Sequence, residues 1–524
     1  MTVIMTILLA VGLVCLLLSL YVQCGKRRKP APLPPGPKSR PLLGNVTELL
    51  RSQQWVMFSK WGEIYGGIVH VSALGQSIVV LNDAKYALDT LDKKGRLYSN
   101  RPTLMMAGKL VGWDEGPALI QISKTWGEYR RLFAQFMGTR AKIDVFQDVL
   151  QQETHTFLRR TLVDPEGWVK HGCKFAGSIV LTLAYGYKAV GDEDDRMVRL
   201  VDEAVEPFSK TTASNAFLVD VFSILRHVPE WFPGASWKKK VPKYRKTLQD
   251  MLNLPYDWVK QQAATGAARA CFVSSLLEKE KLTAEEEHVI KWAAAGIYSG
   301  GADTTVAGIK SPFPAVTLHV VEQRKLKKNS TTLSEPTSYL PLLTACDCPI
   351  LRRCSLNTSC IRHGAHRCLL HVLREDDVHN GYFIPKGSIV IANVWQFFKD
   401  PKTYAAPEAF SPERFIASEG HAKEKDPREY LFGFGRRRVL ITSCPRSDAG
   451  LFTRLSWNPL ADASMWLLCA SALAAFDIRP PMKDGKLVLP SGKYMDGSIS
   501  HPEQFECVIT PRTRAAEALV HAAG

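Results

Sequence analysis

Residues 300–305 read Gly-Gly-Ala-Asp-Thr-Thr and end an apolar stretch, Thr283 to Thr305, whose periodicity predicts a long amphipathic helix. A glycine inside a helix costs about 1 kcal/mol relative to alanine, so a neighbour must require the space. Two interpretations stay open from this segment alone. Either the helix crosses another helix closely, or it leaves room for a bound ligand, to which Asp303 and the hydroxyl of Thr304 relay protons.

The sequence around this helix predicts further helices and a few short strands. Residues 68–71 and 78–81 flank a glycine-containing turn and predict a β-hairpin. The pattern from Ala84 to about Asp303 is mainly helical, residues 382–391 are rich in strand formers, and helix returns at 460–475. The predicted fold class is therefore mainly α with small β-sheets, in one large domain.

Composition narrows the class of protein. The chain has 524 residues, of which 46% are hydrophobic and 23% charged, which is enough to bury a large core. Intrinsic disorder, a collagen-like fibre and a small disulfide-stapled protein are excluded. The net charge of +16 fits an anionic membrane surface, an acidic protein partner or nucleic acid, and by itself does not choose among them.

The N-terminus favours the membrane. Residues 1–25 carry no charge, and such an apolar run is long enough to span the roughly 30 Å hydrocarbon core of a bilayer. The basic residues at 26–29 follow directly, and by the positive-inside rule they keep the rest of the chain in the cytosol. We therefore expect a transmembrane anchor at 1–25, a basic and proline-rich hinge at 26–45, and a catalytic or binding domain at 46–524.

Several short motifs accompany the 300–305 segment, in a fixed order along the chain. They are Trp126-Gly127-Glu128-Tyr129-Arg130, Pro229-Glu230-Trp231-Phe232-Pro233-Gly234, Asn393-x-Trp395, Asp400-Pro401, Pro407-Glu408, Pro412-Glu413-Arg414-Phe415 and Phe432-Gly433-Phe434-Gly435-Arg436-Arg437. Each motif is weak evidence alone, because Trp126 fits an ordinary core and Phe432 to Gly435 fit an ordinary turn. The ordered set resembles the cytochrome P-450 superfamily, in particular the microsomal haem-thiolate monooxygenases of fungal secondary metabolism.

The resemblance implies a cytochrome P-450 fold, preceded here by the N-terminal anchor helix, and a haem cofactor. By the family pattern, Asp303 and Thr304 manage protons, and Trp126, Arg130 and Arg437 hold the haem propionates. Phe432 and Gly435 open the haem loop, and a cysteine thiolate binds the iron. The family also implies an NADPH-dependent reductase, a lipophilic small-molecule substrate and an endoplasmic reticulum membrane as partners. No nucleic-acid motif accompanies the basic residues, so no nucleic acid is expected.

Two stretches depart from the family pattern. The family requires Glu-x-x-Arg on a helix before the haem loop, to pair with the arginine that is Arg414 here, but no glutamate occurs between Glu335 and Glu375. The haem loop also places cysteine at position 439, where this chain has Val439. The nearest cysteine is Cys444, five residues later, and it is the metal ligand that the sequence offers.

The composition of these stretches suggests an explanation. Residues 310–373 carry nine basic and three acidic residues, and five of the twelve cysteines fall within 346–368. We hypothesise that 309–373 are frame-shifted coding sequence and that 438–459 are a retained intron, since family motifs resume on both sides. A zinc site in the cysteine cluster is the rival interpretation, but the paired Cys-x-x-Cys spacing is missing.

Two functions therefore follow from the sequence. The first is a haem-dependent monooxygenase that inserts one oxygen atom from O₂ into a lipophilic small molecule. The alternative is a catalytically inactive, membrane-anchored homologue or mis-predicted gene product that lacks a proper haem ligand.

Overall fold

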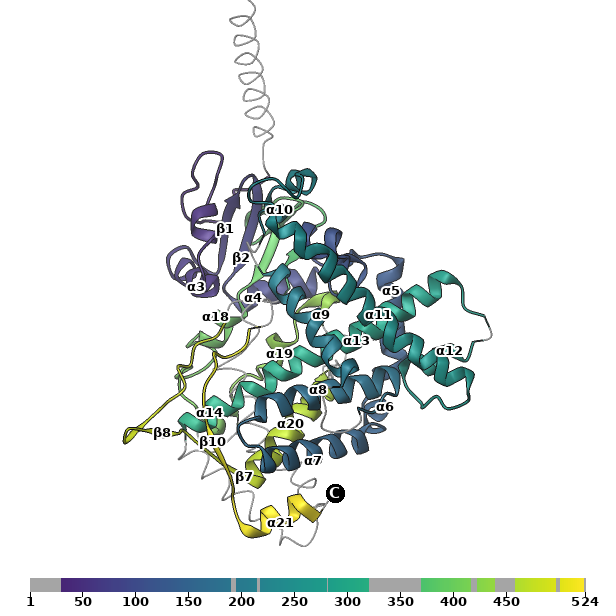
Figure 1. Ribbon diagram of the computed structural model, residues 1–524. Helices are drawn as coiled ribbons and strands as arrows, with labels where there is room; N and C mark the ends of the chain where they lie inside the picture. The colour runs from purple at the N-terminus through teal and green to yellow at the C-terminus, as the bar shows by residue number, and fades with distance from the viewer. Residues whose placement is uncertain are drawn as a thin grey trace, which may run out of the picture.

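A bundle of long helices forms the body of the protein, and a small sheet lies at one side (Figure 1). The computed structural model describes residues 30–189, 195–213, 217–279, 281–319, 369–415, 422–438, 458–495 and 500–522. The helices that build the body are α5 (Lys124–Met137), α7 (Gln147–Val163), α8 (Trp168–Tyr185), α9 (Arg196–Thr212), α11 (Val241–Ala264), α13 (Ala284–Lys310) and α20 (Asn458–Ala475).

Shorter helices connect and cover this body. The α-helices among them are α2 (Val46–Leu49), α3 (Gln54–Tyr65), α4 (Ala84–Ala87), α6 (Arg140–Asp144), α10 (Leu218–Val221), α12 (Phe272–Leu277), α14 (Pro312–Leu318), α18 (Val394–Lys399), α19 (Arg428–Leu431) and α21 (Arg514–Ala522). Tighter or wider turns form η1 (Leu88–Lys93), η2 (Met105–Val111), η3 (Trp113–Glu115), η4 (Ser223–His227), η5 (Ser236–Lys240), η7 (Pro412–Phe415) and η8 (Gly435–Arg437).

The strands are short and form one four-stranded sheet and three two-stranded ones. They are β1 (Ile68–Ala73), β2 (Gln76–Leu81), β3 (His371–Val372), β4 (Asp377–His379), β5 (Tyr382–Ile384), β6 (Ile389–Ala392), β7 (Phe476–Arg479), β8 (Met482–Lys483), β9 (Lys486–Leu487) and β10 (Val508–Pro511). The larger sheet has the order β1-β2-β6-β3, and the pairs are β4–β5, β7–β10 and β8–β9. The predicted class, mainly α with small sheets, is confirmed.

The larger sheet joins two distant parts of the chain. The hairpin predicted at 68–81 is present as antiparallel β1 and β2, with Val69 opposite Val80. The strand-rich patch at 382–391 forms two strands that do not pair with each other. β5 pairs with β4, whereas β6 runs parallel to β2 and places Ile389 opposite Ile78.

The long helix α13 begins where the sequence predicts and continues five residues beyond the predicted end at Thr305. The hydroxyl of Thr283 accepts a hydrogen bond from the backbone N–H of Glu286, and the carboxylate of Glu286 accepts one from the backbone N–H of Thr283, which forms a capping box. The helix ends at Lys310, and Pro312 starts α14 at a position where its missing N–H costs nothing. α13 packs mainly along α8, and both cross the middle of the body in Figure 1.

Part of the stretch that the sequence marks as aberrant lies in the core. Phe313 of α14 is 3% exposed and stacks on Trp168 of α8 with ring centres 4.1 Å apart. His371 and Leu373, near the end of that stretch, are also buried. The frame-shift and intron boundaries at 309–373 and 438–459 remain predictions.

Within the residues that the structure describes, no helix is both long and apolar enough to cross a bilayer. The anchor predicted at 1–25 and the basic residues at 26–29 lie outside those residues. The later part of the hinge is described. There the carbonyl oxygen of Pro35 accepts a hydrogen bond from the backbone N–H of His70, which ties the proline-rich segment to β1.

Candidate active site

The two glycines of α13 serve different purposes. A Cβ atom added to Gly301 would lie 2.5 Å from a Cγ atom of Val180, so this glycine permits the close crossing of α13 over α8. A Cβ atom added to Gly300 would meet nothing within 4 Å, because Gly300 faces open space. The close-crossing interpretation therefore holds for Gly301, whereas the ligand interpretation, for which Gly300 leaves open space, stays a prediction.

Thr304 lies on the same open side as Gly300. Its side chain is exposed, and its hydroxyl donates a hydrogen bond of 2.5 Å to the carbonyl oxygen of Gly300, one turn earlier. This bond uses the hydroxyl proton and leaves the oxygen lone pairs of Thr304 available as acceptors. The open side of α13 thus carries a hydroxyl whose oxygen can accept a hydrogen bond.

Asp303 has a different neighbour, which sequence reasoning missed. Its Oδ1 atom lies 3.0 Å from Nε2 of His501, in the C-terminal part of the chain, and both side chains are largely buried. No motif in the sequence links a histidine near the C-terminus to α13. Only the fold brings the two residues together.

Trp126, Arg130 and Arg437 come together as the family pattern implies. The guanidinium of Arg130 lies 5.0 Å from the centre of the Trp126 ring, and that of Arg437 lies 5.3 Å from it. Arg437 donates to the carbonyl oxygens of Ser99, Pro117 and Ile120, and Arg130 donates to that of Arg436. These bonds join α5, the segment before it and the turn η8 into one corner.

Gly435 and Phe432 shape the turn that carries Arg437. Gly435 adopts a left-handed backbone with φ of +58°, and a Cβ atom there would collide with the carbonyl oxygen of Leu91. Its backbone N–H donates to the carboxylate of Asp92 in η1. Phe432 is half-buried at the end of α19. Only glycine fits at position 435, so the motif reflects close packing of this loop on η1.

Arg101 and His371 extend the same corner, although the sequence did not single them out. Arg101 donates to the carbonyl oxygens of Ala118, Leu369 and Leu370. His371 is buried, with Nδ1 2.6 Å from the carbonyl oxygen of Tyr98. His371 was overlooked because it falls within 309–373, and Arg101 because it follows no recognised spacing. We call Arg101, Arg130, His371 and Arg437 the cationic corner.

Burial and mutual repulsion lower the pKa values in the cationic corner. Burial, together with Arg101 and Arg130, lowers the pKa of Arg437 to about 8, and burial lowers that of Arg130 as well. Burial and the charge of Arg101 lower the pKa of His371 to about 3. Among the described residues, no carboxylate pairs with Arg130 or Arg437. Clustered cations of this kind form a binding site for a ligand with one or two carboxylates.

The comparisons with known proteins identify the family. The cytochrome P-450 family model matches residues 34–438, more than half of the chain. The chain is 43% identical to cytochrome P-450 monooxygenase 208 of Postia placenta over 98% of this chain and 96% of that protein. It is 34% identical to cytochrome P-450 monooxygenase claR of Ampulloclitocybe clavipes over 94% and 89%.

The chain belongs to the cytochrome P-450 family. It is also 31% identical to the O-methylsterigmatocystin oxidoreductase of Aspergillus flavus, covering 93% of this chain and 89% of that one. Among solved structures it resembles a zebra fish cytochrome P-450 with abiraterone, with a TM-score of 0.66 at 18% identity. That likeness covers 88% of this chain and all of the zebra fish chain, and it shows the fold.

The family binds haem through a cysteine thiolate, and the cationic corner fits the carboxylate edge of that cofactor. Arg101, Arg130 and Arg437 would supply guanidinium donors for the two propionates, and a bound anion would raise the lowered pKa values of Arg130 and Arg437. The iron side is not described, because Cys444 and Val439 both lie outside the described residues. The family match ends at residue 438, one residue before Val439.

In the family, the arginine at the position of Arg414 pairs with the Glu-x-x-Arg motif that is missing here. In this structure Arg414 pairs with a different acid. Its side chain is 4% exposed and lies 3.2 Å from the carboxylate of Glu424, which is 9% exposed. Arg414 also donates to the carbonyl oxygens of Ala406, Ala409 and Ser411. The buried cation is therefore neutralised within the segment before the haem loop.

The zinc interpretation has no support in the described part of the chain, where no three potential ligands cluster. The cysteines at 346–368 on which it rests lie outside that part. Burial raises the pKa of the thiol of Cys173 to about 11 and that of Cys469 to about 12, so these two cysteines stay protonated and are poor metal ligands.

Proposed function

We propose that this cytochrome P-450 inserts one oxygen atom from O₂ into a lipophilic small molecule, in the secondary metabolism of a fungus. The observation that carries the proposal is that the cationic corner, which includes Arg130 of α5, occurs together with an open, hydroxyl-bearing side of α13, a helix that contacts α5. Its relatives include a fungal oxidoreductase that is named for O-methylsterigmatocystin. That name supports a lipophilic small molecule as the class of substrate here.

The residues of this chain have separate tasks in the proposed reaction. Haem, when bound, would supply the iron at which O₂ is activated, and the transferred oxygen atom would come from O₂. Arg101, Arg130 and Arg437 hold its propionates, and Trp126 keeps two of these guanidinium groups in place by cation–π contact. Gly300 leaves space on the open side of α13. Thr304 accepts and passes protons at its Oγ1 atom, and Asp303 takes them up and releases them at its carboxylate.

We further propose an NADPH-dependent reductase as the electron donor and a single-pass anchor in the endoplasmic reticulum, with the catalytic domain in the cytosol. The net charge of +16 suits an acidic docking partner. Exposed apolar side chains gather in the segment from α10 to η5, namely Leu218, Val221, Phe222, Ile224, Trp231 and Phe232. α10 lies at the same end of the molecule as β1, onto which the hinge folds (Figure 1).

The membrane proposal is tested with the full chain and a variant that lacks residues 1–29. We expect the full chain to stay with the membrane after alkaline carbonate extraction. The shortened variant should leave the membrane in carbonate or high salt, because its exposed apolar segment alone binds only at the surface. Complete extraction of the full chain would contradict an anchor at 1–25.

An inactive homologue is the second candidate, and Val439 is the observation that favours it. Valine offers no lone pair to iron, and Cys444 follows five residues later. Haem loading separates the two candidates. The full chain is expressed with excess haem, reduced and exposed to carbon monoxide, and its Soret band is recorded.

A thiolate-type band that disappears in Cys444→Ala but persists in Cys507→Ala would support the monooxygenase, with Cys444 as ligand. If wild type gives no such band but Val439→Cys does, the chain as written is the inactive homologue of an active ancestor. Absence of the band in both would contradict a haem-thiolate site.

A further inference from the structure

An imidazole from the C-terminal segment holds the acidic residue of the 300–305 motif. Nε2 of His501 lies 3.0 Å from Oδ1 of Asp303, and the side chains are 15% and 23% exposed. The Nδ1 atom of His501 is buried without a hydrogen-bond partner. The ring nitrogen of His501 that has a partner is therefore Nε2, and that partner is Asp303.

The backbone on either side of His501 is braced. The N–H of Met495 donates to the carbonyl oxygen of His501 at 2.9 Å, and the hydroxyl of Ser500 donates to the carbonyl oxygen of Met495 at 2.5 Å. Tyr494 and Pro502 form a β-bridge just outside this pair. The backbone beside the imidazole is thus tied at two points, which limits how far the imidazole can move from α13.

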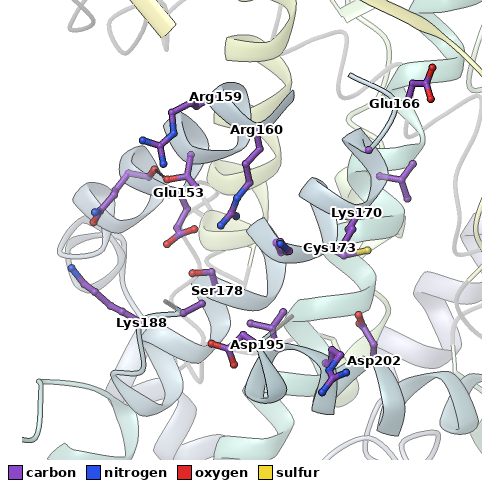
Figure 2. Close-up of a pocket in the computed structure, with 18 residues that line it drawn as sticks. Glu153, Arg159, Arg160, Glu166, Lys170, Cys173, Ser178, Lys188, Asp195 and Asp202 are labelled. Carbon is purple, nitrogen blue, oxygen red and sulfur yellow. Dashed lines mark hydrogen bonds between the residues drawn. The ribbon is translucent and has the colours of Figure 1, made fainter. Parts of the chain in front are cut away.

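Three groups interact with Asp303 from the elements packed around it, namely Cys173 of α8, Asp202 of α9 and His501. Lys310 of α13 interacts with Cys173 and Asp202. Cys173 and Asp202 line one pocket to which α7, α8 and α9 contribute side chains, as Figure 2 shows. Burial and the charge of Asp303 raise the pKa of Asp202 to about 6. Since Asp202 repels the negative charge of Asp303, an attractive partner is required on another side.

Among the described residues, His501 is the basic side chain within ion-pair distance of Asp303. It contacts one carboxylate oxygen, Oδ1, and leaves Oδ2 for proton exchange with water or with a neighbouring group. A carboxylate without this contact would be repelled by Asp202 and would sample other rotamers.

We propose that His501 is a positioning residue for the oxygen-activation motif, and that its imidazole fixes the orientation of the carboxylate of Asp303. The consequence of this contact is that the C-terminal segment takes part in proton delivery. That consequence rests on the proposed monooxygenase function. The contact itself does not depend on turnover. Two experiments therefore address it separately.

The first experiment tests the contact without turnover. Urea unfolding midpoints are measured for the full chain and for His501→Leu, Asp303→Asn and the double variant, with His521→Gln as a control on an exposed histidine of α21. If the residues are coupled, the double variant shifts the midpoint by no more than the larger single shift. Additive shifts would overturn the proposal.

The second experiment tests the consequence, using the holoenzyme with reductase, NADPH and 7-ethoxycoumarin as the probe. We expect His501→Leu to lower product formed per NADPH by about tenfold and to raise hydrogen peroxide, because misplacing a catalytic group by about 1 Å costs up to about a hundredfold. The solvent isotope effect should increase, and haem content should stay as in wild type. His501→Gln keeps an N–H donor and should restore most of the loss.

The outcomes distinguish the two proposals. Wild-type coupling efficiency and isotope effect in His501→Leu would overturn the positioning role. If wild type itself oxidises no probe and binds no haem, the proposed function fails, and the role of His501 in proton delivery falls with it. The urea measurement then still decides whether the contact with Asp303 exists.

Discussion

The guanidinium groups of Arg130 and Arg437 lie 5.0 and 5.3 Å from the centre of the same Trp126 ring. Two cations beside one aromatic ring repel each other, and burial sharpens this repulsion. The lowered pKa of Arg437, about 8, shows how unfavourable its charge is without an anion. Binding of a carboxylate ligand would relieve this repulsion, and the relief would strengthen the binding of that ligand.

Arg437→Gln should therefore weaken haem binding by about tenfold or more, since a hydrogen bond to a charged group contributes about 1.5–3 kcal/mol. Haem affinity is measured by titration of the haem-free protein. Arg436→Gln is the matched control, because its exposed side chain lies outside the corner, so this substitution removes one positive charge near Arg130 without removing a guanidinium of the corner. Equal loss of affinity in the two variants would contradict a specific role for Arg437.

The glycine pair of α13 gives a second prediction. Gly301→Ala places a methyl group 2.5 Å from Val180 and should lower the free energy of unfolding by about 1–3 kcal/mol, as overpacked cores do. Gly300→Ala meets open space and should raise it by up to about 1 kcal/mol, through helix propensity. Urea unfolding measures both changes, and Val180→Ala should partly rescue Gly301→Ala. Similar effects of the two substitutions would show that the helix crossing is not tight.

The buried pair of Arg414 and Glu424 gives a third prediction. Glu424→Gln leaves the cation of Arg414 buried without its carboxylate, which should cost about 3 kcal/mol of stability. Glu413→Gln, on an exposed neighbouring glutamate, should change stability by less than about 0.5 kcal/mol. Thermal unfolding of both variants is the measurement. A neutral Glu424→Gln would mean that the carbonyl oxygens around Arg414 suffice.

The buried imidazole of His371 gives a prediction about pH. In the unfolded chain it takes up a proton near pH 6.5, whereas in the folded chain burial and Arg101 delay protonation to about pH 3. The stability that His371 contributes is therefore complete above pH 6.5 and decreases as the pH falls through this window. Between pH 7 and pH 5 the unfolding midpoint should fall more in wild type than in His371→Asn. The asparagine side chain keeps the donor to Tyr98 but does not titrate. Parallel changes would exclude His371 as the cause.

Much of the fold was predictable because local sequence patterns determine where its helices and strands begin and end. The apolar periodicity from Thr283 onward, the capping residues and Pro312 define α13 at both ends, and alternating β-branched residues define β1 and β2. Strand partners were not predictable for residues 382–391, since period and propensity do not say which edge a strand joins.

The site was predictable where residues share a motif and not where they meet only in space. Trp126 and Arg130 lie one helical turn apart, so their contact follows from helix geometry. His501 and Glu424 reach their partners through the fold, and no spacing rule connects His501 to Asp303 or selects Glu424 among the acids near Arg414. Arg101 was missed for the same reason.

The parallel pairing of β2 with β6 affects how the protein is made. Ser77 and Ser388 are hydrogen-bonded at 3.0 Å although they are 311 residues apart. A ribosome adding roughly 5–20 residues per second needs roughly 15 to 60 s to deliver the second strand after the first. During that time the hairpin presents an open edge to other nascent chains, which is a template for aggregation. The yield of correctly folded enzyme should therefore depend on translation speed and on chaperones that shield this edge, independently of the final stability.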